Sequence, residues 1–142
     1  MALNLKGMAP LLQVFDMPTS LRFYREILGF MIVQSSGEGD NVNWVLLSLN
    51  DIEIMLNTAY EKDTRPDSPN LERISIHSDT ILYFGCPDIE GTYSILVKKG
   101  IDIRKPATTG YGWKALDLFD PDGYHLCFHW PLEKTADSNI KG

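Results

Sequence analysis

Cysteine is scarce in this sequence, and long apolar runs are absent. Cys86 and Cys127 are its two cysteines, and they fall in different segments that we expect to be strands. Two such residues cannot build a disulfide framework, so we expect reduced thiols. No stretch reaches the roughly 18 consecutive apolar residues of a membrane-spanning helix, and no charged-then-apolar signal segment opens the chain. These absences predict a cytoplasmic protein.

Positive charge and several well-known motifs are also lacking. Lys and Arg number 13 against 19 Asp and Glu, which gives a net charge of −6. An acidic chain repels phosphate backbones and anionic lipids, so nucleic acid and membranes are not expected partners. The sequence contains no CxxC, GxGxxG, HExxH or GxSxG pattern and no P-loop. The chemistries that depend on these motifs therefore find no support.

What is present is one order of elements that occurs twice. The length and the 44% apolar content suit a single domain over residues 1–142. Asp16 and Asp88 are helix N-cap candidates before amphipathic stretches, and Gly29 and Gly100 close these stretches. We expect strands at residues 8–15, 30–33, 42–49 and 52–57, and again at residues 80–86, 101–105, 113–119 and 124–130. The pattern predicts two βαβββ modules, at about residues 7–57 and 79–131.

The remaining segments are polar. Residues 58–78 are rich in charge, proline and small side chains. We expect a surface linker there, with a short extended piece at residues 73–77. Residues 132–142 are expected to form a frayed polar tail.

The last two strands form a predicted hairpin with two distinct faces. Its turn is Asp120-Pro121-Asp122-Gly123, in which Pro suits the second position and Gly the fourth position of a type I turn. In the second strand, side chains alternate between faces. Tyr124, Leu126 and Phe128 share the apolar face, and the opposite face carries His125, Cys127 and His129.

These features resemble one known family. The helix SLRFYREILGF, the turn and strand DPDGYHLCF, and the duplication are similar to the vicinal oxygen chelate superfamily, also called the glyoxalase/bleomycin resistance/dioxygenase family. The resemblance covers about residues 7–131. It implies an α+β fold in which two βαβββ modules form a curved, partly open mixed sheet. It also implies a ligand on the concave face and a homodimer.

The resemblance also implies where metal-dependent relatives place their ligands. Those positions correspond here to Ala9, Met55, Ile81 and Cys127. Ala, Met and Ile side chains are not ligands for a hard divalent cation, and one Cys does not hold zinc alone. The sequence is therefore more similar to the metal-independent, bleomycin-resistance-like members, which hold planar or cationic ligands by stacking. No cofactor is expected.

Three function classes stay open. The first is a small-molecule-binding protein, antibiotic resistance-like, without a catalytic metal. The second is an enzyme, either a metal-dependent lyase, isomerase or dioxygenase with displaced ligands, or a metal-free acid–base catalyst. Glu53, His125 and His129 are its candidate catalytic residues. His125 and His129 are about 13 Å apart on one strand, so a single ion cannot join both. The third class is a ligand-sensing or self-association module.

Strand parity selects candidate ligand-binding residues. Those expected on the concave face or its rim are Gln13, Glu53, Met55, Tyr83, Tyr111, Trp113, His125, Cys127 and His129. Some of these residues have a simpler interpretation. The Trp and Tyr side chains can serve core packing, the two His can be hydrogen-bonding residues that line the groove, and Glu53 can be a strand-end carboxylate that reaches solvent. For Trp44, both faces of its strand carry apolar residues, so parity does not assign its side.

Overall fold

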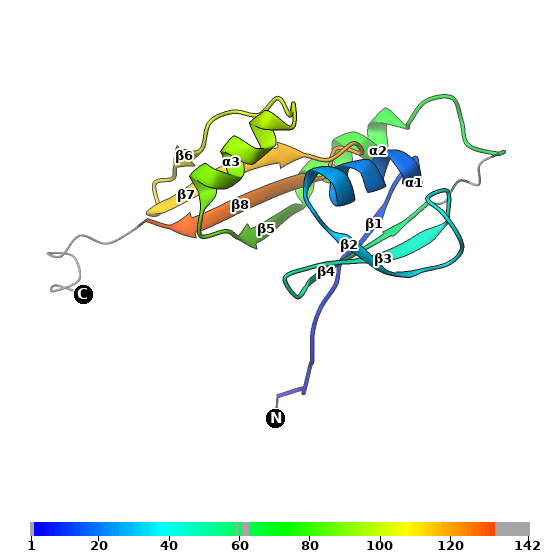
Figure 1. Cartoon of the computed structure of the whole chain (residues 1–142), viewed down its shortest axis with the longest axis horizontal. Helices are drawn as coiled ribbons and strands as arrows, with labels where there is room; N and C mark the ends of the chain where they lie inside the picture. The colour runs from blue at the N-terminus through cyan, green and yellow to red at the C-terminus, as the bar shows by residue number, and fades with distance from the viewer. Residues whose placement is uncertain (1, 59, 61–62, 133–142) are drawn as a thin grey trace, which may run out of the picture. The chain divides into compact units, whose positions relative to one another are not determined.

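The computed structural model describes residues 2–58, 60 and 63–132, and most of the predicted polar tail therefore lies outside the described residues. The chain divides into two compact units, residues 1–74 and 75–142. Figure 1 shows the elements of both units. Among the described residues, no helix has the length and apolar character needed to cross a membrane.

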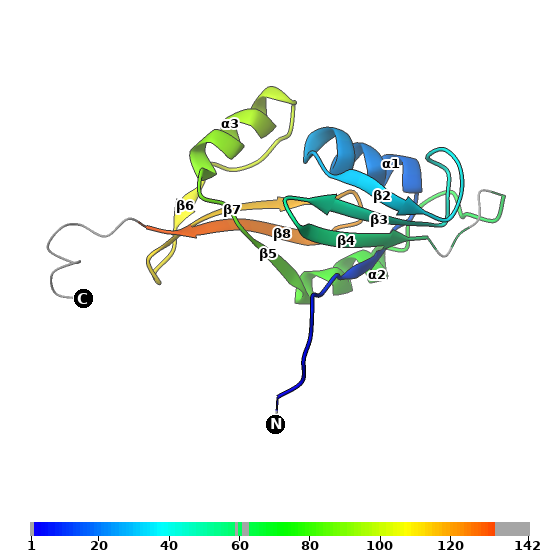
Figure 2. The same cartoon turned by 60° about the horizontal axis from the view of Figure 1, so that its bottom comes forward.

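The first unit is a four-stranded mixed sheet with a helix against one face. Its strands are β1 (Leu11–Gln13), β2 (Met31–Ser35), β3 (Trp44–Leu49) and β4 (Ile52–Asn57). The spatial order is β1-β4-β3-β2, and β1 runs parallel to β4 while the other pairs are antiparallel. Figure 2 shows the helix lying along one side of β2 and β3. The β3–β4 turn places Asn50 and Asp51 at positive φ, as tight hairpins require.

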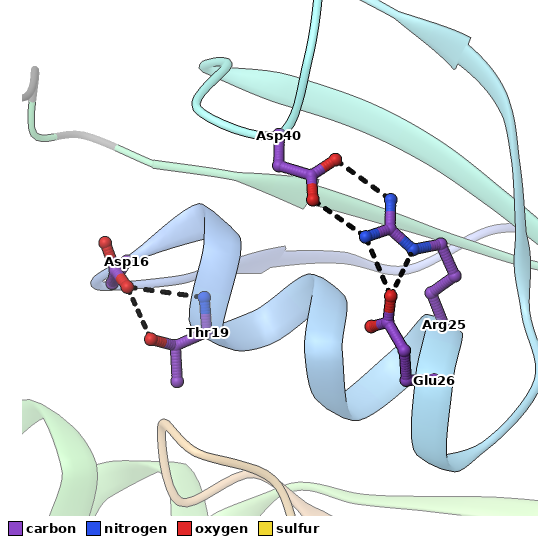
Figure 3. A network of polar contacts seen from close by, with 5 residues as sticks. All are labelled: Asp16, Thr19, Arg25, Glu26 and Asp40. Atoms are coloured by element: carbon purple, nitrogen blue, oxygen red, sulfur yellow. Dashed lines mark hydrogen bonds and ion pairs between the residues drawn. The ribbon is translucent and has the colours of Figure 1, made fainter.

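The helix of this unit starts at a capped end and changes pitch midway. It comprises α1 (Met17–Leu21) and the π-helical segment η1 (Arg22–Ile27). Asp16 caps it by accepting hydrogen bonds from the Thr19 backbone N–H, at 3.3 Å, and from the Thr19 hydroxyl (Figure 3). Gly29, at φ 94°, ends it. Its buried face meets the buried face of the sheet, which carries Val45, Leu47, Ile54 and Leu56.

The second unit repeats this order. Its elements are η2 (His77–Asp79), β5 (Ile81–Gly85), α3 (Ile89–Lys98), β6 (Ala107–Thr108), β7 (Trp113–Phe119) and β8 (His125–Pro131). The order is β5-β8-β7-β6, and β5 and β8 are parallel. α3 packs on β7 and β8 (Figures 1 and 2), above the buried side chains of Leu116, Leu118 and Leu126. The predicted α+β fold with two βαβββ modules is confirmed.

Two local predictions were wrong. Residues 73–77, expected to be extended, belong to α2 (Leu71–Ile76) and η2. The side-chain oxygen of Asn70 accepts hydrogen bonds from the backbone N–H groups of Glu72 and Arg73. Asn70 is therefore the N-cap of this helix. The polar composition of residues 58–78 favoured a linker. The Asn70 cap nevertheless starts a helix within this segment.

The other error concerns the edge of the second sheet. Residues 101–105 have no regular structure, and the edge strand is β6, which pairs with Lys114 and Ala115 of β7. Alternation of apolar and charged side chains favoured a strand at 101–105. A strand also needs a hydrogen-bonding partner, and the β7 partner lies opposite residues 107–108 instead.

Candidate functional site

A cavity of about 370 Å³ lies on the outward face of the second sheet, away from α3. Proteins bind small molecules in pockets of roughly 300 to 1,000 Å³, so its size is adequate. Strands β5, β7 and β8 and the loop before β7 supply its walls. The lining residues are Tyr83, Thr109, Tyr111, Trp113, Ala115, Asp117, Cys127 and His129.

Aromatic rings form one wall of this cavity. The Trp113 indole stacks on the His129 imidazole with ring centroids 4.5 Å apart and planes 19° apart. The Tyr83 ring lies against the same imidazole at 5.0 Å, tilted by 59°. Trp113, Tyr83 and His129 come from three different strands, which the parallel β5–β8 and antiparallel β7–β8 registers bring together. The three rings offer π-faces to a planar ligand.

The rim of the cavity is a hydrogen-bonded turn. The Thr109 hydroxyl accepts from the backbone N–H groups of Tyr111 and Trp113, and the Thr109 N–H donates to the Trp113 carbonyl at 2.7 Å. Gly112 has φ 79°, a conformation that a side chain disfavours. The turn holds Tyr111 outward, where 90% of the residue is exposed. Tyr111 is therefore available to cover a ligand from the edge.

Cys127 lies at the floor of the cavity and is 2% exposed. Burial raises the pKa of its thiol to about 11, and the nearby carboxylate of Asp117 adds to the increase. The two residues are direct neighbours in the β7–β8 register. A protonated thiol is a poor nucleophile. At neutral pH, Cys127 is a neutral wall residue.

Sequence reasoning missed three cavity residues, Thr109, Ala115 and Asp117, and of these Asp117 carries a charge. Its Oδ1 accepts a hydrogen bond of 2.7 Å from His125 Nε2, and the two also form an ion pair whenever His125 is protonated. The His125 ring stacks on Phe119 at 4.7 Å. His125 is thus directed to Asp117 and does not line the cavity, although it shares the outward face with Cys127 and His129. The alternation in residues 113–119 could have indicated Asp117, since it shares the parity of Trp113.

Three further candidates lie in the first unit, on the outward face of its own sheet. The Gln13 side-chain carbonyl accepts from the Asn57 amide at 3.2 Å. Met55 pairs with Leu11 and Leu46, and Glu53 pairs with Ser48 near the β3–β4 turn. The structure also decides the side of Trp44. It pairs with Asn57 and therefore lies on the outward face of the first sheet. The cavity residues Tyr83, Tyr111, Trp113, Cys127 and His129 all belong to the second unit.

Comparison with known proteins identifies the family. The family model described as Glyoxalase/Bleomycin resistance protein/Dioxygenase superfamily matches residues 8–128. The chain belongs to this superfamily. No curated protein matches the chain.

Several solved structures share the fold. The protein SMU.1112c is 25% identical, with a TM-score of 0.67 over 89% of this chain and 100% of its own. A glyoxalase/bleomycin resistance protein/dioxygenase superfamily member from Sphaerobacter thermophilus is 20% identical, with a TM-score of 0.65 over 89% and 97%. A glyoxalase/bleomycin resistance protein from a Streptomyces species is 19% identical, with a TM-score of 0.60 over 86% and 97%.

The residues at the superfamily's metal positions do not fit a divalent cation. Within the described ranges, no group of three or more His, Cys, Asp or Glu side chains is placed to hold a metal ion. Ile81 pairs with His125 in the sheet and has no donor atom, and Cys127 alone does not complete a zinc site. His125 is engaged with Asp117.

Proposed function

We propose that this superfamily member binds a small planar cation on the outward face of its second sheet and needs no catalytic metal to do so. One observation carries the proposal. The stacked Trp113 and His129 rings, with Tyr83 beside them, line a cavity that also contains the Asp117 carboxylate. A flat ring provides the stacking partner, and a positive charge provides the partner for Asp117.

Physical magnitudes support this ligand class. Aromatic contacts contribute about 0.5 to 1.5 kcal/mol beyond the burial of area, and a cation over an aromatic face adds about 0.5 to 2 kcal/mol. The Asp117 side chain is 56% exposed, so solvent screens its attraction. Stacking therefore contributes more than charge, and charge contributes selectivity for cations. The net charge of −6 attracts such ligands at long range.

The name of the Streptomyces relative suggests a biological form of this binding. That protein is called a glyoxalase/bleomycin resistance protein. A protein that sequesters a toxic planar cation needs no turnover. We propose sequestration of this kind as the role of the cavity.

A matched pair of probes tests the proposal. Isothermal titration with 10-methylacridinium, a planar cation, is compared with acridine, its neutral analogue, at mildly alkaline pH. We expect the cation to bind with one site per chain and acridine to bind more weakly. Equal binding of both would contradict selectivity for cations through Asp117. Binding of neither would overturn the whole proposal.

Metal analysis tests the second half of the proposal. The purified protein is dialysed and its zinc, nickel, manganese and iron contents are measured. We expect far less than one ion per chain, because the donor set does not fit one. One ion per chain that survives dialysis would contradict the metal-free assignment.

The competing function is a metal-free acid–base enzyme, and the His125–Asp117 contact favours it. A carboxylate 2.7 Å from an imidazole nitrogen fixes the orientation of the ring, as an acid–base catalyst requires. His125→Ala and His129→Ala variants discriminate between the classes. If a turnover is found, loss of activity in His125→Ala with full acridinium binding would favour the enzyme.

A further inference from the structure

A second cavity, of about 300 Å³, lies in the first unit, at one end of its sheet. The parallel strands β1 and β4 both end there, and the antiparallel strand β3 begins there. Residues just beyond these strand ends and residues of two loops form its walls. The lining residues are Phe15, Met17, Asn41, Asn43, Thr58, Tyr60 and Arg65. None of them belongs to the cavity of the second unit.

The lining combines one cation with amides and two rings. The Arg65 guanidinium carbon lies 5.4 Å from the centroid of the Phe15 ring. The Tyr60 ring meets the same Phe15 ring edge-on, with centroids 5.7 Å apart. Asn41 and Asn43 bring side-chain amides, which both donate and accept hydrogen bonds. The cavity therefore offers hydrogen-bond donors beside an aromatic wall.

Arg65 is held in position by the helix cap. Nη1 of its guanidinium donates to Oδ1 of Asp16, a residue 49 positions earlier in the chain. The other oxygen of Asp16 accepts the capping hydrogen bonds from Thr19 (Figure 3). Both oxygens of this carboxylate are thus engaged. The guanidinium has further N–H donors in the same rigid plane.

A second ion pair anchors the loop that carries Asn41 and Asn43. Two nitrogens of Arg25 donate to the two carboxylate oxygens of Asp40, at 2.9 and 2.7 Å, and Arg25 also bonds Glu26 (Figure 3). The hydrogen bonds and the positive charge of Arg25 lower the pKa of Asp40. Asp40 directly precedes Asn41, and the carbonyl of Asn43 accepts a hydrogen bond from the backbone N–H of Thr58 at 2.9 Å. The loop that carries the two amides is therefore anchored to η1 and to the end of β4.

From this arrangement we propose that the first-unit cavity binds a small aromatic carboxylate. The planar fork of Arg65 matches a carboxylate bidentately, which a Lys ammonium does not. Asn41 and Asn43 donate to the same group, and Phe15 and Tyr60 contact the ring of the ligand. A volume near the lower end of the roughly 300 to 1,000 Å³ range of ligand pockets suits a single-ring molecule.

Benzoate and benzamide are the matched probes for this site. They have nearly the same shape, but only benzoate carries a charge. Two-dimensional NMR titrations of the full chain follow the backbone signals of residues 41, 43 and 58. We expect saturable shifts with benzoate and at least tenfold weaker binding of benzamide. No saturable shift with benzoate, or equal binding of both probes, would overturn the proposal.

Four variants separate recognition from folding. Arg65→Lys keeps the charge and loses the fork, and Asn41→Ala leaves both ion pairs in place. We expect each to weaken benzoate binding at least threefold, while Arg22→Gln, a change at an exposed arginine, has no effect. Unchanged binding in both Arg65→Lys and Asn41→Ala would overturn the assignment. Trp113→Leu should leave benzoate binding intact, so this site and the second-unit cavity fail independently.

Discussion

The two units have the same strand order and equivalent parallel strand pairs, β1–β4 and β5–β8, yet their outward faces differ. Leu11 pairs with Met55 in the first unit at the place where Tyr83 pairs with Cys127 in the second. The buried faces match, since Ile54 and Leu126 are both fully buried under a helix. The first sheet turns a mixture of apolar side chains, such as Leu46 and Met55, and polar ones, such as Glu53, outward, whereas the second turns Trp113, Asp117 and His129 outward. Packing constrains the buried face of a duplicated sheet, and the outward face is free to diverge.

The cavities differ in the same way. In the second unit the cavity lies over the face of the sheet and is bounded by rings. In the first unit it lies beyond the strand ends, and loops anchored by ion pairs supply the walls. The outward aromatic face therefore suits a stacked cation, and the polar edge suits an anion. Four predictions test how far the two units correspond.

The largest effect is expected in the shared buried face. Ile54→Ala and Leu126→Ala remove equivalent, fully buried side chains, so each should lower the free energy of unfolding by about 2 to 5 kcal/mol. Urea denaturation measures both. Phe119→Ala, at a side chain exposed on the outward face, should cost much less. A small effect at one of the two buried sites would show that the units are not packed alike.

The second prediction contrasts two outward tryptophans. Trp113→Leu removes the stack on His129 and should weaken 10-methylacridinium binding about tenfold, because aromatic contacts are worth about 0.5 to 1.5 kcal/mol beyond area. Trp44→Leu, on the outward face of the first sheet, should leave the affinity unchanged. Titration calorimetry of both variants provides the comparison. If Trp44→Leu loses affinity instead, the ligand binds on the first sheet, and the assignment to the second sheet is wrong.

A smaller effect is expected for the outward carboxylates. Asp117→Asn should weaken acridinium binding about threefold, since exposed charge interactions are worth roughly 0.2 to 1 kcal/mol. The affinity for neutral acridine should not change. Glu53→Gln, on the other sheet, is the matched control and should alter neither. An equal loss of both ligands in Asp117→Asn would mean that the carboxylate acts through structure rather than charge.

The fourth prediction concerns pH. Burial and Asp117 raise the pKa of Cys127 to about 11 in the folded chain, above the value of about 8.5 for an exposed thiol. The unfolded chain therefore loses this proton first as pH rises, so stability from this thiol is complete below about pH 8.5 and declines as pH approaches the folded pKa. We expect the free energy of unfolding, measured by denaturation, to fall as pH rises across this range. Cys127→Ala should remove this thiol's part of that slope. An unchanged slope in the variant would assign the titration to another group.

Local patterns predicted most of the fold. Alternation identified the hairpin strands, and β7 matches the predicted residues 113–119. Asp16 and Asp88 cap helices as expected, because a cap depends on residues three positions away. The same reasoning failed at residues 101–105, where the decisive factor was a distant partner strand. It also failed at 73–77, where polar composition concealed a helix start at Asn70.

The candidate site was predictable in part. Parity placed His125, Cys127 and His129 on one face, and the register confirms that placement. Parity could not show that His125 turns toward Asp117, because that contact joins two strands. The face of Trp44 was undetermined for a similar reason, since both sides of its strand are apolar and only its pairing with Asn57 decides.

The sequence by itself determined the two βαβββ modules, the capped helices and the final hairpin, because alternation and capping act over a few residues. Tertiary structure alone decided which side chains meet. Trp113 and His129 stack only after β7 and β8 pair. Arg65 reaches Asp16 across 49 positions, and no local pattern encodes a contact of that length. Both proposed ligand sites rest on such contacts between distant residues.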